Sequence, residues 1–216
     1  MRVLVLSAAV VMVDQIAKLL VKGFALPALG IEWAGMAYGS SIPLLGDFFR
    51  LTYIENPGMA FGIDMGGKLF FSIFSVVASG AIFLYLYYAR SAGLGFRIAL
   101  ALILGGAVGN LIDRVFYGVL FGEAPLFYGK VVDFFDVDFF DLTIFSYSMS
   151  RWPVFNIADA CVTIGVVLLL VFQGSSHRST DRTRESAGEA GGASATSSAP
   201  MAAAPAEPGR SSGKAP

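Results

Sequence analysis

Residues 69–89 form the uncharged run LFFSIFSVVASGAIFLYLYYA, which is the clearest structural signal in the chain. A helix of about 20 apolar residues is long enough to cross the roughly 30 Å of hydrocarbon in a bilayer. Three other apolar runs reach a similar length, at about residues 3–21, 96–115 and 152–172. The sequence therefore predicts an all-α polytopic membrane protein with four transmembrane helices, in which the small residues at 105–109 allow close helix packing.

The composition of the 216 residues agrees with a membrane protein and excludes several other classes. Apolar residues make up 56% of the chain and charged residues only 14%, whereas soluble domains carry about 25% charged residues. The net charge of −1 excludes a basic nucleic-acid-binding protein, and the single Cys161 excludes a disulfide scaffold. We therefore expect contact with membrane lipid and none with nucleic acid.

The first apolar run differs from a secretory signal peptide, although it lies near the N-terminus. Only Arg2 precedes it, no small-residue cleavage site follows it, and Asp14 and Lys18 interrupt it. We therefore expect a retained helix. Side chains four residues apart lie on one helix face, so Asp14 and Lys18 are expected to form a structural ion pair, with direct participation in chemistry as the alternative.

Four spans place both chain termini on one side of the membrane and the long connections, residues 22–68 and 116–151, on the other side. Lys and Arg accumulate on the cytoplasmic side of membrane proteins. Counted as far as Arg184, six of them lie on each side, but those on the side of the termini lie in shorter segments. This distribution favours cytoplasmic termini.

Two segments outside the expected spans have an informative composition. The β-forming residues at 48–54, followed by the turn sequence NPG at 56–58, predict a small β element on the extracytoplasmic side. Residues 174–216 are rich in Ala, Ser, Gly and Pro, a composition typical of disorder. We therefore expect a membrane domain over residues 1–173 and a disordered cytoplasmic tail whose removal leaves activity intact.

Paired Asn and Asp residues mark the candidate site. Asn110 and Asp113 end the third expected span, and Asn156 and Asp159 begin the fourth with the same three-residue spacing, which suits one helix face. Because these two spans end and begin on the same side, their carboxylates should meet at one membrane boundary. A further carboxylate, Asp133, lies between them in an apolar segment.

Ionisable groups at a membrane are costly to bury and usually mark function. Two neighbouring carboxylates share one proton, so one can act as an acid and the other as a base on a single water, as in the aspartic proteases. The Asn side chains could orient the carboxylates or polarise a carbonyl group. The alternative is a set of polar helix ends that only face the lipid headgroups.

Other kinds of chemistry lack the necessary residues. The only histidine, His177, lies in the tail, so the sequence offers no His-based zinc site and no Ser-His-Asp triad. Asp136, Asp138 and Asp141 lack the glycine and closing glutamate of a calcium loop and indicate a solvated acidic loop. Cys161 is expected to be a packed thiol. We therefore expect no metal and no cofactor.

Five sequence blocks, in this order, resemble those of the bacterial lipoprotein signal peptidases (signal peptidase II): VDQIAK at 13–18, NPGMAF at 56–61, GGAVGNLIDR at 105–114, VVDF at 131–134 and FNIAD at 155–159. The resemblance implies an aspartic endopeptidase of the bacterial inner membrane with cytoplasmic termini. Its substrate would be a diacylglyceryl-modified prolipoprotein, cut before the lipidated cysteine, and we expect the enzyme to be a monomer.

The resemblance also implies a role for each matching polar residue. The catalytic pair would be Asp133 and Asp159, which the spacing alone does not favour over Asp113. The residues that support the site and the substrate would be Asn56, Asn110, Asp113, Arg114 and Asn156, while Asp14 and Lys18 would be structural.

Two connections depart from the family pattern. The segment between Asp113 and Asp133 is unusually long and contains FYG twice, at 116–118 and 127–129, which indicates an insertion over about residues 118–130. The following connection, 134–150, is also long and acidic. A small proton-coupled transporter that uses intramembrane Asp residues is the alternative function, and a non-enzymatic assembly factor is a second one.

Overall fold

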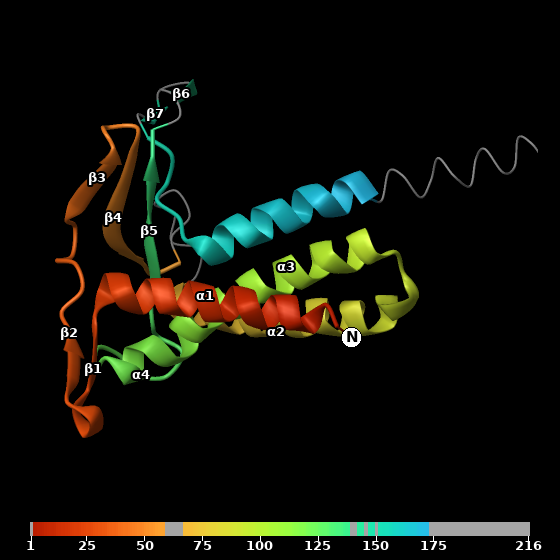
Figure 1. The fold of residues 1–216 in the computed structure, drawn as a ribbon, viewed down its shortest axis with the longest axis horizontal. Helices are drawn as coiled ribbons and strands as arrows, with labels where there is room; N and C mark the ends of the chain where they lie inside the picture. Colours follow the sequence, from red (N-terminus) through yellow and green to blue (C-terminus); the bar gives the residue numbers. More distant parts are fainter. Residues whose placement is uncertain (1, 59–66, 139–141, 145–146, 150, 173–216) are drawn as a thin grey trace, which may run out of the picture. The chain divides into compact units, whose positions relative to one another are not determined.

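The computed structural model describes residues 2–58, 67–138, 142–144, 147–149 and 151–172 (Figure 1). Three parts of the sequence interpretation lie outside these residues: the expected disordered tail, the MAF sequence at 59–61 and Asp141.

Among the described residues, three helices are long and apolar enough to cross a membrane: Leu4–Lys22, Gly67–Ser91 and Leu94–Leu120. The first is α1 (Leu4–Lys22), and the second consists of α2 (Gly67–Tyr88) and the short η2 (Ala89–Ser91). The third consists of α3 (Leu94–Ile112), the π-helical η3 (Asp113–Tyr117) and α4 (Gly118–Leu120). A shorter apolar helix spans Ile157–Phe172. This is the architecture of a helical membrane protein.

The last helix begins at Ile157 and not at residue 152, where the apolar run begins. The residues before it are extended, because Phe155 forms an isolated antiparallel bridge with Phe135. The amide of Phe135 donates to the carbonyl of Phe155 at 2.7 Å, and the amide of Phe155 donates back at 3.0 Å. The backbone groups of Phe155 are therefore used in the sheet, and the helix starts after them.

Small residues of α3 allow its neighbours to approach closely, as the run at 105–109 indicates. A Cβ atom at Gly105 would lie 2.8 Å from Cβ of Val10 in α1, and one at Gly106 would lie 2.7 Å from Cγ2 of Val162 in the last helix. Adjacent glycines thus face two different helices. Dispersion contacts at such short backbone separations hold membrane helices together.

The last helix runs along most of α3. Near the start of the last helix, Ala158 packs against Gly106 and Gly109, and at its end Phe172 packs against Gly95. These contacts bring the first turn of the last helix to the C-terminal end of α3. Figure 1 shows the same antiparallel course, with the two helices side by side.

The strands among the described residues form three small antiparallel sheets near one end of the helices (Figure 1). The largest has the order β3-β4-β5, and the other two are hairpins. The strands are β1 (Phe24–Leu26), β2 (Ile31–Trp33), β3 (Ser41–Leu45), β4 (Phe49–Asn56), β5 (Val131–Val137), β6 (Leu142–Ile144) and β7 (Tyr147–Met149). The β element expected at 48–54 therefore corresponds to β4, as part of a larger sheet.

The expectation of a solvated acidic loop is wrong for Asp136. Strand β5 continues to Val137, and the side chain of Asp136 is only 6% exposed. Its carboxylate accepts hydrogen bonds from Arg151 Nε and from Thr52 Oγ1, both at 2.7 Å. A buried carboxylate must be paired, and Arg151, which lies distant in the sequence, supplies the pairing that the local composition does not reveal.

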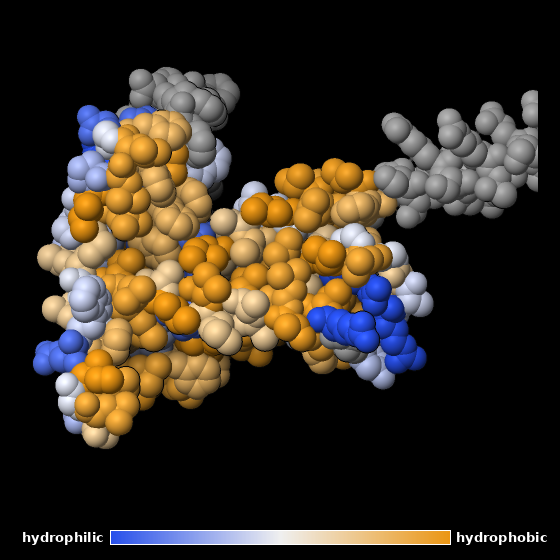
Figure 2. All heavy atoms as spheres, in the orientation of Figure 1, coloured by the Kyte–Doolittle hydropathy of each residue, from blue (hydrophilic) through white to orange (hydrophobic). Residues whose placement is uncertain are grey.

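The helices present apolar side chains to the outside, as a lipid-embedded protein must. Large hydrophobic side chains are strongly exposed on α1, α2 and the last helix, for example Val5 (73%), Phe74 (60%) and Leu170 (64%). Figure 2 shows this hydrophobic surface over the helices, with hydrophilic residues gathered near the turn after α2 and on the sheets. The distribution agrees with helices that lie in a bilayer.

Candidate active site

The polar residues singled out in the sequence meet where the sheet touches the C-terminal end of α3. Asp133 lies in the middle of β5, opposite Ile54 of β4, and is 2% exposed. Its flanking residues Val132 and Phe134 are also buried. A strand that is buried on both faces carries no alternation of polar and apolar residues, so its sequence does not reveal it as a strand.

Asp159 lies in the first turn of the last helix, where it forms a reciprocal cap with Asn156. The amide of Asp159 donates to Asn156 Oδ1 at 2.9 Å, and the amide of Asn156 donates to Asp159 Oδ2 at 3.2 Å. This is the geometry of a capping box, in which each side chain satisfies a free backbone N–H group. The three-residue spacing of Asn156 and Asp159 therefore reflects a helix cap. It was expected to reflect two side chains on one helix face, as for Asn110 and Asp113.

The side-chain amide of Asn156 joins the two carboxylates. Its Nδ2 donates to Asp133 Oδ1 at 2.6 Å and also contacts Oδ1 of Asn110 at 3.1 Å. Asn110 in turn donates from Nδ2 to Asp159 Oδ1 at 2.7 Å. Asp133 and Asp159 are thus linked through two amides that orient both of them.

A separate ionic group lies directly behind these amides. Lys18 Nζ contacts Asp14 Oδ2 at 2.7 Å, Asp113 Oδ2 at 2.8 Å and Asn110 Oδ1 at 2.9 Å. The side chains of Lys18, Asp14 and Asp113 are all fully buried. The ion pair expected between Asp14 and Lys18 is therefore present and includes a second carboxylate.

The two carboxylates of this ionic group, Asp14 and Asp113, also accept hydrogen bonds from backbone amides of the candidate site. Asp14 Oδ1 accepts from the amide of Ala158 at 2.9 Å, which fixes the start of the last helix to α1. Asp113 Oδ2 accepts from the amide of Val132 at 3.2 Å, which fixes β5 to the end of α3. The Lys18 group therefore positions the segments that carry Asp159 and Asp133.

Gln15 belongs to the same network, although the sequence interpretation gave it no role. Its Nε2 donates to Asp113 Oδ1 at 2.9 Å and to the carbonyl of Gly109 at 3.1 Å. Its Oε1 accepts from the hydroxyl group of Tyr117 at 3.0 Å. The sequence could have revealed this role, because Gln15 is a polar amide within an apolar run and such a group needs buried hydrogen-bond partners.

The environment of Asp133 favours its protonated form. Burial raises the pKa of Asp133 to about 7, and the negative charge of Asp159 acts in the same direction. Hydrogen bonds from Asn156 and Asn56 and the charge of Lys18 oppose this rise without cancelling it. A carboxyl group with a pKa near neutrality can hold a proton at working pH and release it during a reaction.

Two further residues named from the sequence border the pair. Asn56 ends β4, where its Oδ1 accepts from the amide of Gly58 at 2.9 Å and fixes the turn after the strand. Arg114 is half-buried and donates to Ser75 Oγ at 3.3 Å, while its charge acts on both Asp133 and Asp159. Within the described residues its Nε atom has no hydrogen-bond partner.

An apolar cavity of about 370 Å³ opens beside Asp159, and we call it the Asp159 pocket. Its walls are Trp152, Phe155, Asp159, Ala160, Thr163 and Ile164. Asp159 is half-buried, whereas Asp133 is buried and does not line this pocket. The arrangement offers an apolar chain access to one member of a carboxyl pair. In the described part of the chain, no group of three or more His, Cys, Asp or Glu side chains could hold a metal ion.

Sequence comparisons place this arrangement among known enzymes. A sequence model of the signal peptidase (SPase) II family matches residues 6–173. The chain is 37% identical over 186 residues to a lipoprotein signal peptidase of Porphyromonas gingivalis, covering 74% of this chain and 76% of the relative. A lipoprotein signal peptidase of Halothermothrix orenii is 36% identical over 163 residues, covering 76% of this chain and 88% of the relative.

The fold is also similar to that of solved structures. A bacterial membrane enzyme determined by the in meso method at 2.3 Å resolution aligns with a TM-score of 0.57 and 29% sequence identity. The alignment covers 82% of this chain and 89% of the other. Because the family match extends over most of the described residues and includes every member of the carboxylate and amide network, the chain belongs to the signal peptidase II family.

Proposed function

We propose that this protein is an aspartic endopeptidase that removes the signal peptide from diacylglyceryl-modified prolipoproteins by cutting before the lipidated cysteine. Membership of the signal peptidase II family supports peptide hydrolysis and a prolipoprotein substrate. The observation that carries the aspartic mechanism is the bridge of amides between Asp133 and Asp159. Because these amides link the two carboxyl groups, we consider a proton-coupled transporter and an assembly factor to be weaker alternatives.

In the proposed reaction Asp133 carries the shared proton and Asp159 acts as the base. Asp159 removes a proton from a water molecule, whose oxygen then bonds to the scissile carbonyl carbon. Asp133 donates its proton to the carbonyl oxygen, which stabilises the tetrahedral intermediate. The carbon–nitrogen bond then breaks as Asp159 returns its proton to the leaving amine and Asp133 recovers its own.

This division of roles follows from the different surroundings of the two carboxyl groups. Asp133 is 2% exposed and has a raised pKa, so it is the better proton carrier. Asp159 is more accessible and borders the apolar pocket, so it is better placed to meet a water molecule and the substrate. The amides of Asn110 and Asn156 hold both groups in one orientation, which lowers the reorganisation needed during catalysis.

We further propose four transmembrane spans in the bacterial inner membrane, with both termini in the cytoplasm and the enzyme acting as a monomer. Support for the fourth span is the helix Ile157–Phe172, which packs along α3 as far as Gly95. At about 1.5 Å per residue its length is near the lower limit for a span. The site would then lie at the extracytoplasmic boundary, where a signal peptide ends.

The function is tested with purified protein and a prolipoprotein in lipid-modified and unmodified form. Asp133→Asn and Asp159→Asn should each reduce cleavage of the modified substrate at least about 10³-fold, as loss of an acid–base group does. The Asp47→Asn variant, changed at an exposed pair with Arg50, is the control and should remain active. Full activity of either site variant, at equal accumulation in the membrane, would disprove the aspartic mechanism.

A further inference from the structure

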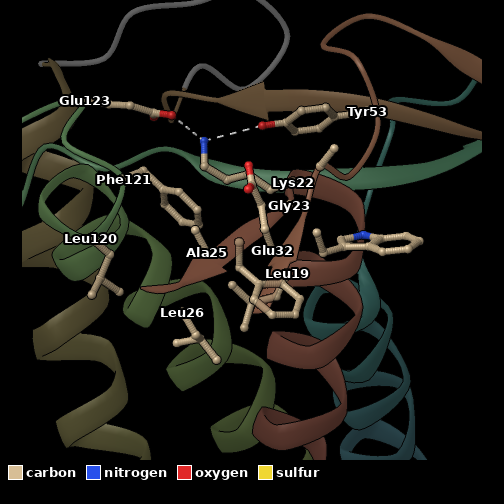
Figure 3. Close-up of a pocket in the computed structure, with 13 residues that line it drawn as sticks. Leu19, Lys22, Gly23, Ala25, Leu26, Glu32, Tyr53, Leu120, Phe121 and Glu123 are labelled. Carbon is tan, nitrogen blue, oxygen red and sulfur yellow. Dashed lines mark hydrogen bonds and ion pairs between the residues drawn. The ribbon is translucent and has the colours of Figure 1, made fainter. Parts of the chain in front are cut away.

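A second and larger cavity, of about 700 Å³, lies at the C-terminal end of α1 (Figure 3). We call it the Lys22 pocket. It is lined by Leu19, Lys22, Gly23, Phe24, Ala25, Leu26, Glu32, Trp33, Ala34, Tyr53, Leu120, Phe121 and Glu123. It shares no lining residue with the Asp159 pocket, so the two are separate sites. Its volume is within the range of small-molecule sites, about 300–1,000 Å³.

Four elements build the Lys22 pocket: the last turn of α1, the β1–β2 hairpin, strand β4 through Tyr53, and the segment after α3. The hairpin is fixed to the helix because Trp33 Nε1 donates to the carbonyl of Leu20 at 2.8 Å. The segment after α3 contributes Leu120, Phe121 and Glu123. These three residues belong to the insertion at about 118–130, which therefore forms a wall of this pocket and not of the Asp159 pocket.

The position of the pocket, at the end of an apolar helix long enough to cross a membrane, fits the headgroup level of a bilayer. Apolar side chains of α1 such as Ile16 (52%) and Leu20 (50%) are exposed just below it, and the helix ends at Lys22. Trp33 is half exposed at the same level. Tryptophan is enriched at the boundary between hydrocarbon and headgroups, because its ring is apolar and its N–H group is polar.

The cation inside the pocket is already neutralised. Lys22 Nζ forms an ion pair with Glu55 and a second with Glu123 at 2.6 Å, and it lies 4.5 Å from the ring centroid of Phe121. Glu55 is also paired with Lys130 at 2.8 Å. Two lysines and two glutamates thus balance one another, and Lys22 has no charge left for an anionic ligand.

Glu32 is the charge without a counterpart. No salt bridge in the described part of the chain includes it. It is exposed, and Figure 3 shows its side chain directed into the pocket beside Lys22, with Leu19 and Leu26 below. The Lys22 pocket therefore combines an apolar lower wall, an aromatic residue at the headgroup level and one net negative charge.

We propose that the Lys22 pocket binds a phospholipid whose headgroup carries a primary ammonium group, of the phosphatidylethanolamine class. The ammonium group pairs with Glu32, and an acyl chain lies against Leu19, Leu26 and Leu120. A lipid with an anionic headgroup, such as phosphatidylglycerol, is disfavoured because its only charge is repelled by Glu32. This site is independent of peptide cleavage and goes beyond the proposed function.

The test is native mass spectrometry of the purified full-length chain in detergent, titrated with phosphatidylethanolamine or phosphatidylglycerol of the same acyl chains. We expect phosphatidylethanolamine to bind about fivefold more tightly, which is the contribution of one partly exposed ion pair. The Glu32→Gln variant should lose this preference, and Glu32→Asp should retain most of it. The Asp47→Asn control, at an exposed acid far from the pocket in the β3–β4 turn, should keep the preference.

Equal affinity of the unaltered protein for the two lipids would mean that only unspecific surrounding lipid is bound and would overturn the proposal. A preference that persists in Glu32→Gln would overturn it as well. Because Glu32 is exposed and unpaired in the described structure, the variant should fold, and an unchanged thermal transition verifies this. Cleavage of prolipoprotein is measured in a separate assay. Whether cleavage is lost or retained therefore does not affect the conclusion on lipid binding.

Discussion

At the scale of single residues, the buried aspartates differ in the kind of partner each one meets. Asp113 faces the ammonium group of Lys18 and uses both of its oxygens for protein contacts. Asp133 faces amide groups and the charge of Asp159. Burial near a second carboxylate favours the protonated form of Asp133. In the proposed mechanism this difference in partners assigns a structural role to Asp113 and a chemical role to Asp133.

The first prediction concerns the pH dependence of cleavage. Burial and the charge of Asp159 raise the pKa of Asp133 to about 7, and in the proposed mechanism the protonated form is active. As the pH rises through 7, the protonated fraction falls, so kcat/KM should decrease by up to about tenfold per pH unit. A pH–rate profile of the purified enzyme measures this. Activity that increases between pH 7 and 9 would show that Asp133 is not the proton carrier.

The Asn156→Ser variant tests the cause of that pH dependence. Serine retains an oxygen for the helix cap but removes the amide that donates to Asp133, and this hydrogen bond favours the ionised carboxylate. The pKa of Asp133 should therefore rise, and the falling limb of the profile should move to higher pH. A limb that moves to lower pH would contradict the assigned role of Asn156.

At the scale of elements, a half-buried ionic cluster connects α1 with the sheet. Glu55 in β4 accepts from Lys22, from Lys130 at 2.8 Å and from Tyr53 at 2.8 Å. It lies opposite Val132, one residue away from Asp133 along β5. Burial alone would raise the pKa of Glu55, but the hydrogen bonds from Lys130, Lys22 and Tyr53 outweigh it and lower the pKa to about 2.

The Glu55→Gln variant should therefore be less stable, by about 2 kcal/mol near neutral pH, with allowance for partial solvent screening. The ordinary pKa of 4.5 lies above the value in the folded protein, so the stabilisation by Glu55 is present above pH 4.5 and is lost as the pH falls towards 2. Thermal unfolding in detergent, compared with Asp47→Asn, measures the effect. If the stability difference between the Glu55→Gln variant and the unaltered protein increased as the pH falls, the stabilising role of the Glu55 carboxylate would be contradicted.

Helix packing gives another prediction at this scale. Gly106→Ala places a methyl group 2.7 Å from Val162 Cγ2 and against the backbone of Ala158, next to Asn156. The start of the last helix must then move, and we expect a loss of cleavage of at least about 10²-fold, since displacements near 1 Å have such effects. Gly80→Ala in α2 is the matched control, because nothing lies within 4 Å of its new Cβ atom. Equal activity of the two variants would exclude this packing.

At the scale of the whole molecule, the sequence predicted what depends on local composition. The apolar runs located the helices, and the order of the polar blocks identified the family, which the comparisons confirmed. The pairing of β5 with β4 was not predicted, because it joins distant segments and β5 lacks alternation. The reciprocal cap of Asn156 and Asp159 has the same spacing as a pair on one helix face, so the sequence could not distinguish the two. The second carboxylate partner of Lys18 and the partners of Gln15 and Asp136 likewise became visible only in the assembled fold.

The last prediction concerns how the assembled fold lies in the membrane. The β3–β4 turn and the link between α2 and α3 lie at opposite ends of the helices (Figure 1). In a Cys161→Ser background, cysteine at exposed Asp47 in that turn and cysteine at exposed Ser91 in that link should therefore face opposite sides. A membrane-impermeant maleimide should label the Asp47→Cys variant in intact spheroplasts and the Ser91→Cys variant only after lysis. The reverse pattern would invert the proposed orientation and place the carboxyl pair at the cytoplasmic boundary, where no exported signal peptide ends. Labelling of both variants on the same side would contradict the passage of α2 across the bilayer, and with it the proposed number of spans.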